Sequence, residues 1–304
     1  MAKDTVIALS TMWGIGRYDH MSQFVEKTRN LGFTHVELNY QVTEEMLEQL
    51  KACSSLAVSS VHSPCPGRAL PDGRWTYRLR MTSEDDQERL PALEGALTAV
   101  DVAVELKAPV VVLHVGSVPL EPGLEPRLRE MYKGGQAETG EFQEVRERLL
   151  ADRNGRKDRY IETALKNLRQ LTGYAGDRGV RIGLESRYYF HEIPNLEETR
   201  LFLDEFGDAV GYWHDVGHCE NLARLGFAPH RDWLEAFSGH MIGTHLHDID
   251  VLADHKAPGK GTLDLDRVAP YIPAGAIRVC ELSSANTEED VLAGLAVLTK
   301  AGII

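Results

Sequence analysis

The stretch "GYWHDVGH" at residues 211–218 carries His214, Asp215 and His218 within five positions, directly after a short apolar run. One interpretation is structural: Asp215 is the N-cap residue of a helix that begins at the next position, and the histidines lie nearby by coincidence. The other is chemical, because imidazole and carboxylate groups are ligands of divalent metals. The positions of the other polar residues decide between the two.

Polar side chains recur where short apolar runs end. They are Glu37, His62, His114, Glu185, His245, His247, Asp248 and Glu281, with Asp254 and His255 in the loop after the seventh run. Taken alone, each has a structural explanation, such as an ion pair between Glu185 and Arg187 or ordinary loop positions for His247 and Asp248. The joint pattern favours a metal site, because four successive runs supply one candidate ligand each: Glu185, Asp215, His245 and Glu281.

The apolar runs themselves predict the fold. Eight β-branched runs occupy residues 5–10, 34–39, 57–62, 109–116, 180–186, 209–215, 241–248 and 276–283. Segments with helical periodicity lie between most of them, including 21–32, 90–106, 160–179 and 288–302. This alternation predicts parallel βαβ units, and eight strands close a barrel. An open doubly wound sheet is disfavoured because no GxGxxG follows the first run. We therefore predict a (β/α)8 TIM barrel over residues 1–304 as a single domain.

In such a barrel the carboxyl ends of all strands meet at one rim. The four residues from successive strands are therefore expected to converge as ligands of one divalent metal ion. With no thiolate among them, the ion is expected to be Mn, Co, Mg or Zn rather than an iron–sulfur cluster. Asp215 and His218 are expected to face this rim, and His214 to lie outside the set of ligands.

Two further segments carry hypotheses of their own. Residues 117–158 separate the fourth run from the next helix and are predicted to form an insertion at the rim, as a lid, a subunit contact or a solubilising segment. The glycine-rich stretch "DHKAPGKGTLD" at 254–264 places Lys260 where barrels often bind phosphate, although a turn with an exposed lysine explains it equally well.

Composition limits the class of partner. The 33 basic and 46 acidic residues give a net charge of −13, which disfavours a nucleic-acid partner because phosphates are repelled. The four scattered cysteines indicate reduced thiols rather than a disulfide framework. No apolar run approaches 18 residues and no signal peptide is seen, so a soluble cytoplasmic protein without a membrane partner is expected.

The order of Glu185, "HDVGH", "HLHD", "DHKAPGKG" and Glu281 resembles the xylose-isomerase-like TIM barrel superfamily over essentially the whole chain. This superfamily holds sugar and sugar phosphate isomerases and epimerases, together with the endonuclease IV enzymes. The resemblance to its ketose 3-epimerase branch implies that one divalent metal is bound by Glu185, Asp215, His245 and Glu281. It also implies that His218 contacts the substrate, and that the two glutamates are catalytic and carry its proton through an enediolate.

The chain is also similar to the endonuclease IV branch. There, His62, His114 and His255 would complete a three-zinc cluster that cleaves phosphodiesters. The chain departs from that branch in two places: "HSPCPGR" lacks an aromatic residue after the His-x-Pro, and Asp254 is adjacent to His255 instead of two positions earlier. The second departure argues against a third metal.

The sequence and the resemblance together predict a metal-dependent isomerase or epimerase of a small sugar, sugar phosphate or keto-polyol. A multi-zinc phosphodiesterase and a dehydratase (lyase) on the same scaffold remain the alternatives. The residues expected to bind substrate or a second metal are His62, His114, His218, His255 and Lys260. A homo-oligomer, either a dimer or a tetramer, is also expected.

Overall fold

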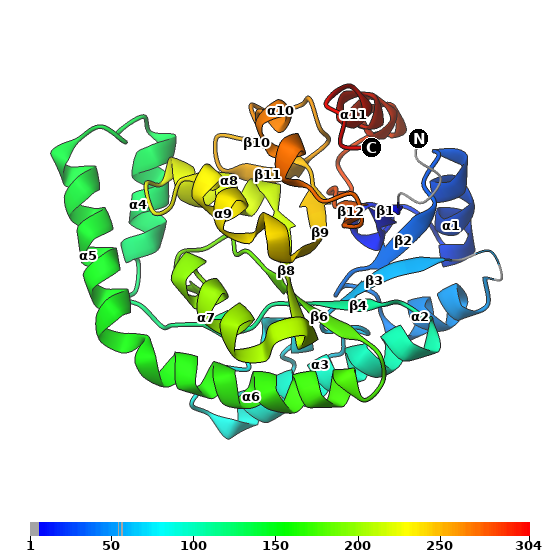
Figure 1. Ribbon diagram of the computed structural model, residues 1–304, viewed down its shortest axis with the longest axis horizontal. Helices are drawn as coiled ribbons and strands as arrows, with labels where there is room; N and C mark the ends of the chain where they lie inside the picture. Colours follow the sequence, from blue (N-terminus) through cyan, green and yellow to red (C-terminus); the bar gives the residue numbers. More distant parts are fainter. Residues whose placement is uncertain (1–5, 54, 56) are drawn as a thin grey trace.

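Eight short parallel strands close into a barrel in the computed structural model, which describes residues 6–53, 55 and 57–304 (Figure 1). Their order around the barrel is β1-β12-β9-β8-β6-β4-β3-β2. The strands are β1 (Ile7–Ser10), β2 (His35–Leu38), β3 (Val58–His62), β4 (Val110–Leu113), β6 (Arg181–Glu185), β8 (Val210–Asp215), β9 (Met241–Leu246) and β12 (Ile277–Cys280). The predicted (β/α)8 barrel is confirmed, with each strand inside its predicted run.

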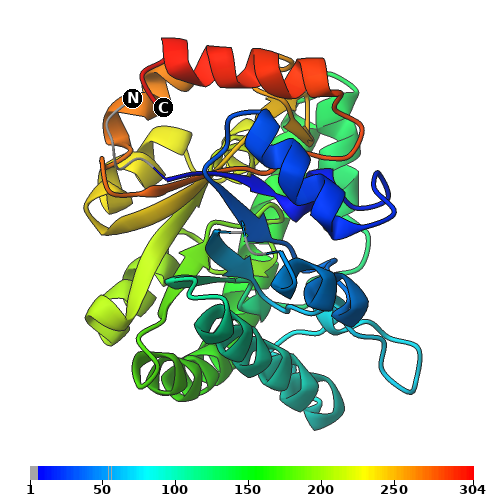
Figure 2. The same cartoon turned by 90° about the vertical axis from the view of Figure 1, so that its right-hand side faces the viewer.

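Helices surround the barrel and cover its outer wall (Figures 1 and 2). They are α1 (Met21–Asn30), α2 (Glu44–Lys51), α3 (Asp86–Glu105), α4 (Leu124–Lys133), α5 (Gly140–Arg156), α6 (Asp158–Gly176), α7 (Leu196–Phe206), α8 (Val216–Arg224), α9 (His230–Phe237), α10 (Leu265–Val268) and α11 (Glu288–Lys300). The last helix lies beside the first, and Lys27 on α1 forms an ion pair with Glu288 on α11 at 2.9 Å (Figure 2). This contact closes the ring of helices. No helix in the described ranges is long and apolar enough to cross a membrane.

Two small antiparallel sheets lie at the rim beyond the strand ends. One pairs β5 (Gly116–Ser117) with β7 (Glu192–Ile193), and the other pairs β10 (Asp248–Asp250) with β11 (Ala253–Lys256). They explain why the predicted runs at 109–116 and 241–248 extend past the barrel strands. Val115, His247 and Asp248, which lie past the barrel strands in these two runs, are all buried.

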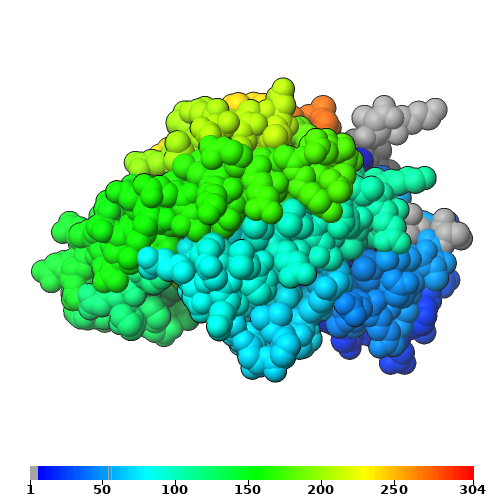
Figure 3. All heavy atoms as spheres, turned by 90° about the horizontal axis from the view of Figure 1, so that it is seen from below, coloured from blue at the N-terminus to red at the C-terminus, as the bar shows by residue number. Residues whose placement is uncertain are grey.

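The segment 117–158 contains two helices, α4 and α5, connected by a short loop. The chain passes from α5 into α6 almost without interruption, because Lys157 between them keeps right-handed helical backbone angles. The surface of α5 and α6 extends continuously along the molecule (Figure 3), and α4 and α5 lie to one side of the barrel (Figure 1). The roles proposed from the sequence for this segment, whether lid, subunit contact or solubilising insertion, stay predictions.

Trp213 fills the interior of the barrel below the rim. Its side chain is fully buried, in a cluster with Ala8, Val110, Val112, Ile277 and Val279. Glycines on the two neighbouring strands make room for the indole: a Cβ on Gly243 would overlap the Trp213 ring, and one on Gly183 would lie 3.1 Å from it. The ring of His245 lies 5.3 Å above this floor, measured between ring centroids. The packed apolar cluster around Trp213 therefore fills the barrel interior, and the polar side chains lie above it, at the ends of the strands.

Candidate metal centre at the mouth of the barrel

Strand alternation brings four polar residues to the same place. Successive side chains of a strand point to opposite faces, so Trp213 and Asp215 on β8 both face the interior while His214 faces outward. By the same rule, Glu185 ends β6, His245 lies near the end of β9, and Glu281 directly follows β12. One ligand atom from each of Glu185, Asp215, His245 and Glu281 lies within 4.8 Å of the others. All four residues expected to converge are thus adjacent.

The imidazole of His245 lies among the three carboxylates. Its Nδ1 is 2.8 Å from Glu185 Oε1, 3.5 Å from Asp215 Oδ2 and 3.3 Å from Glu281 Oε2. Burial opposes protonation of His245, but the carboxylates around it outweigh burial and hold its pKa well above the ordinary value. The group therefore favours positive charge at its centre. Buried carboxylates and one imidazole fit the donor set of a divalent cation, which supplies that charge.

Glu37 fixes the orientation of His245 from the far side of the ring. Its Oε1 lies 3.1 Å from His245 Nε2, and its Oε2 accepts a hydrogen bond of 2.7 Å from Ser60 Oγ. A carboxylate oxygen accepts, so Nε2 donates to Glu37, and Nδ1 is turned toward the other three carboxylates. Carboxylates in this position behind a metal-binding histidine are common. For Glu37, whose role the sequence left open, the structure therefore gives a positioning role.

Asp215 is the N-cap residue of the structural interpretation, and its second oxygen lies where the chemical interpretation needs a ligand. Its Oδ1 accepts a hydrogen bond of 2.7 Å from the backbone N–H of His218, which makes it the N-cap of α8. Its Oδ2 faces His245 in the buried group. His247, interpreted as an ordinary loop residue, is fully buried and holds this carboxylate through Nε2 at 3.0 Å. The backbone N–H of His255 donates to His247 Nδ1, which leaves Nε2 as the donor.

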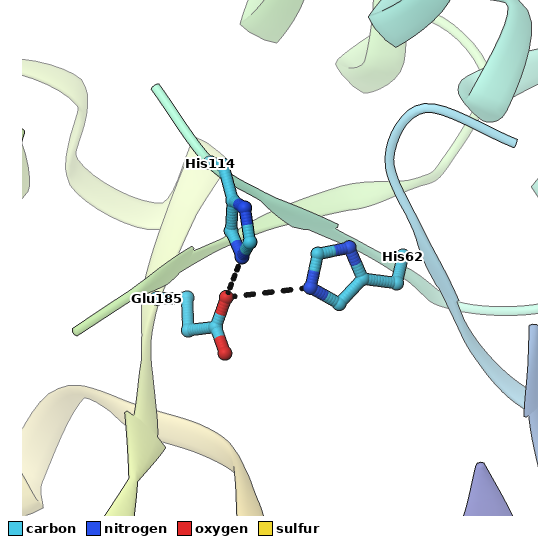
Figure 4. A group of neighbouring side chains, drawn as sticks. All are labelled: His62, His114 and Glu185. Atoms are coloured by element: carbon cyan, nitrogen blue, oxygen red, sulfur yellow. Dashed lines mark ion pairs between the residues drawn. The ribbon is translucent and has the colours of Figure 1, made fainter. Parts of the chain in front are cut away.

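Glu185 also contacts two histidines outside the central group (Figure 4). His62 ends β3 and His114 directly follows the neighbouring strand β4, and both approach Glu185 Oε2 through Nε2, His62 at 3.4 Å. Ligand atoms of these three residues also lie within 4.8 Å of one another. Burial in the barrel mouth and the guanidinium of Arg187 lower the pKa of His114 to about 3, so its ring is neutral at pH 7. Arg187 itself donates to Glu185 Oε2 at 2.9 Å and to Glu192 Oε1 at 2.8 Å.

A third group contains His218, Asp254 and His255. Both histidine Nε2 atoms lie 3.7 Å from Asp254 Oδ2. The adjacency of Asp254 and His255 argued against a third metal, and that stays a prediction. The structure nevertheless brings both side chains to the same mouth: His255 has a φ of 53°, in the left-handed region, and this turn of the backbone lets adjacent side chains face the same side.

The structure does not bring Lys260 to the mouth. Its Nζ forms an ion pair of 2.8 Å with Asp290 in the first turn of α11, and half of its side chain is exposed. Asp248, the first residue of β10, holds the loop instead, because it accepts hydrogen bonds from the backbone N–H groups of Ile249, Gly259 and Leu263. The glycine-rich loop is therefore organised around Asp248, and the structure gives no support for phosphate binding by Lys260.

A cavity of about 360 Å³ opens above the three groups. Its lining residues are Met12, Tyr40, His62, His114, Glu185, Arg187, Tyr188, Tyr189, His218, Asp254, His255 and Glu281. Helix α4 supports this wall from behind: the guanidinium of Arg129 lies 4.2 Å from the ring centre of Tyr188 and 4.9 Å from that of Tyr189. The buried group thus has access to a polar chamber large enough for a small molecule.

Comparisons with known proteins agree with this architecture. The chain is 25% identical over 266 residues to the uncharacterized protein y4fM of Sinorhizobium fredii, covering 81% of this chain and 75% of that one. Among solved structures, it resembles a 3-keto-D-glucoside 4-epimerase from E. coli (16% identity, TM-score 0.66, 98% of this chain and 100% of that one). It also resembles a D-tagatose 3-epimerase-like protein (17% identity, TM-score 0.63, 98% and 97%) and a Thermus thermophilus protein, TTHB071, soaked with ZnCl2 (20%, 0.62, 98% of each).

The family profile described as "Xylose isomerase-like TIM barrel" matches residues 25–301, which is nearly the whole chain. The match includes the strands that carry all four residues of the central group and seven of the eight strands of the barrel. Sequence and topology therefore lead to the same assignment, and the chain belongs to the xylose isomerase-like TIM barrel family.

Proposed function

We propose that this protein is a divalent-metal-dependent isomerase or epimerase of a small sugar or keto-polyol. The observation that carries the proposal is the buried group of Glu185, Asp215, His245 and Glu281 at the floor of an open polar cavity. Two of the similar solved structures are described as a sugar epimerase and an epimerase-like protein, which supports the same class of reaction.

The proposed cation would be held by these four residues. When bound, it would act as a Lewis acid that polarises the carbonyl of the substrate and the neighbouring hydroxyl. Glu185 and Glu281 supply the two carboxylates needed to remove and return a proton at the carbon beside that carbonyl. Return to the opposite face of the same carbon gives epimerisation, whereas return to the adjacent carbon gives aldose–ketose isomerisation.

The surrounding residues hold each glutamate in place. Asn39 Nδ2 donates a hydrogen bond of 3.1 Å to Glu281 Oε1, and Arg187 holds Glu185 Oε2. Burial disfavours the charged form of Glu185, but hydrogen bonding to His114 and His245 and the charge on His245 outweigh it and keep its pKa well below the ordinary value. An ionised Glu185 is therefore available to accept a proton.

The proposal is tested with Glu185→Gln and Glu281→Gln. Wild-type protein, loaded with Mn, Co, Mg or Zn in turn, is incubated with a panel of ketoses and keto-polyols in D2O, and deuterium incorporation beside the carbonyl is followed by NMR. We expect both variants to lose incorporation by at least about 1,000-fold, the scale of a lost acid–base group, while the exposed-surface control Glu289→Gln keeps the wild-type rate. Near-wild-type incorporation in both variants would refute the mechanism.

A multi-zinc phosphodiesterase is the second candidate, and the two further ligand groups favour it. Metal stoichiometry separates the candidates: about one divalent ion per chain favours proton transfer, whereas two or three zinc ions with cleavage of a phosphodiester favour the hydrolase. A dehydratase shares the first proton abstraction and then releases a hydroxyl, so the appearance of an unsaturated product in the same NMR spectra would identify it.

A further inference from the structure

A second cavity of about 240 Å³ adjoins the polar chamber. The two cavities share Tyr40, His114 and Arg187 as lining residues, so they meet at this side of the barrel mouth. The second cavity, here called the side chamber, lies between the residues that follow β3 and the first half of α3. Its remaining lining is Ser63, Pro64, Thr76, Tyr77, Leu79, Met81, Ala92, Ala96 and Leu113.

Aromatic rings connect the side chamber to the candidate metal centre and to the surface. The ring of Tyr40 lies 5.5 Å from that of His62 and 5.4 Å from that of Tyr77. The Tyr77 ring in turn stacks on Trp75 at 5.6 Å, and Trp75 is 36% exposed. Aromatic faces of this kind pack against aryl rings and against the C–H face of a sugar.

The size and chemistry of the side chamber restrict its occupant. An apolar cavity of about 150 Å³ accommodates benzene, so about 240 Å³ admits a six-membered ring. Among its described lining residues, Arg187 is the one cation, and its two terminal nitrogens already bind Glu185 and Glu192. A phosphate or carboxylate would therefore compete with Glu185 and Glu192 for the single guanidinium of this chamber.

We propose that the substrate is a glycoside, whose reacting sugar occupies the polar chamber and whose ring-shaped substituent, an aglycone or a second sugar, occupies the side chamber. This rests on the proposed function, since the reacting sugar is placed by Glu185 and Glu281. A free monosaccharide would leave the side chamber without a ring. The residues Tyr40 and Tyr77 provide the aromatic surface, and Leu79 and Met81 provide apolar contacts.

The experiment fills the side chamber and leaves the polar chamber unchanged. Ala96→Leu and Ala92→Leu each add a larger side chain to its α3 wall, and Ala228→Leu, on a partly buried alanine that lines neither cavity, controls for the added bulk. The probes are members of one keto-sugar panel, each as the free sugar, the methyl glycoside and the phenyl glycoside. Calorimetry gives the dissociation constants of the metal-loaded protein, and NMR gives turnover.

We expect the wild type and Ala228→Leu to bind phenyl glycosides at least about tenfold more tightly than methyl glycosides, which corresponds to about 1.4 kcal/mol. In either filled variant that folds, the ratio should fall to about twofold or less, with free-sugar turnover unchanged. A wild-type ratio near one, or a ratio that survives in a folded filled variant, would overturn the proposal. If the filled variants lose the preference for phenyl glycosides as expected, but no sugar is turned over by any variant or by the wild type, the proposed function alone is refuted.

Discussion

A buried ion pair between α5 and α7 allows a quantitative test of how the rim segment is attached. Arg153 on α5 is 1% exposed, and its two terminal nitrogens donate to both carboxylate oxygens of Glu198 at 2.6 and 2.9 Å. The same guanidinium donates to the backbone carbonyl of Glu192 at 2.9 Å. The substitution Arg153→Met keeps most of the side-chain volume and removes all three hydrogen bonds.

The expected cost follows from what the substitution leaves behind. Glu198 is 3% exposed, and among the described residues the backbone N–H of Asn195 is the hydrogen-bond donor that it keeps. Removing one partner of a buried ion pair typically costs about 3–5 kcal/mol, because the other charge stays buried without compensation. With an m-value of about 3 kcal/mol per molar urea for a chain of this size, the midpoint of unfolding should fall by about 1–1.7 M.

The assay is equilibrium unfolding in urea, followed by circular dichroism. Arg148→Met on the same helix is the matched control, because Arg148 pairs with Glu121 at the surface, where both side chains are about half exposed. Such exposed pairs contribute less than about 1 kcal/mol. The double variant Arg153→Met/Glu198→Gln should be more stable than Arg153→Met, since it no longer buries a lone charge. Equal effects of Arg153→Met and Arg148→Met would refute the reasoning.

Three further predictions concern the site and its supports. Gly217→Ala would place a Cβ in overlap with Cε1 of His247, so we expect the His247 ring to shift. The affinity for Zn or Mn, measured by chelator competition, should then fall about 10- to 100-fold, and unchanged affinity would contradict a positioning role for His247. Burial opposes ionisation of Glu192, but the guanidinium of Arg187 outweighs burial and lowers the pKa of Glu192 to about 2. The stabilising effect of the ionised Glu192 is therefore complete above about pH 4.5 and is lost as the pH falls toward 2. In Glu192→Gln, the free energy of unfolding should fall less steeply between pH 4.5 and 2 than in the wild type, and an unchanged pH dependence would contradict this. Arg129→Met removes the cation behind Tyr188, and steady-state kinetics should show a KM increase of about three- to tenfold with little change in kcat; a loss confined to kcat would argue against a role in shaping the cavity.

The barrel and its central group were predictable because both follow from local pattern. Eight apolar runs of suitable length define the strands, and the last inward position of a strand faces the mouth whatever the rest of the chain does. For this reason Glu185, Asp215, His245 and Glu281 could be grouped without knowing any distance. The position of His214 outside this group follows from the same alternation, since it is next to Asp215.

Residues that act across the barrel were not predictable in the same way. Glu37 meets His245 although their strands, β2 and β9, are separated in the sheet by β1 and β12. Which strand ends meet across the mouth depends on side-chain length and on the depth of the Trp213 floor, and neither is a periodic property of the sequence. The turn at His255 could not be predicted from the alternation of side chains along a strand, because a single residue in the left-handed region changes the side to which its neighbours point.

Glu185 connects the two questions that remain about the chemistry, the number of cations and the kind of reaction. Its Oε1 faces His245 in the central group, while its Oε2 faces His62, His114 and Arg187. If a single cation binds in the central group, His62 and His114 remain as neighbours of the substrate. A neutral His114 can then donate to or accept from a sugar hydroxyl.

If a second cation binds to these histidines, Glu185 must share its carboxylate between two positive charges and becomes a poorer base. The same side chain would then favour hydrolysis over proton transfer, so metal stoichiometry bears directly on mechanism.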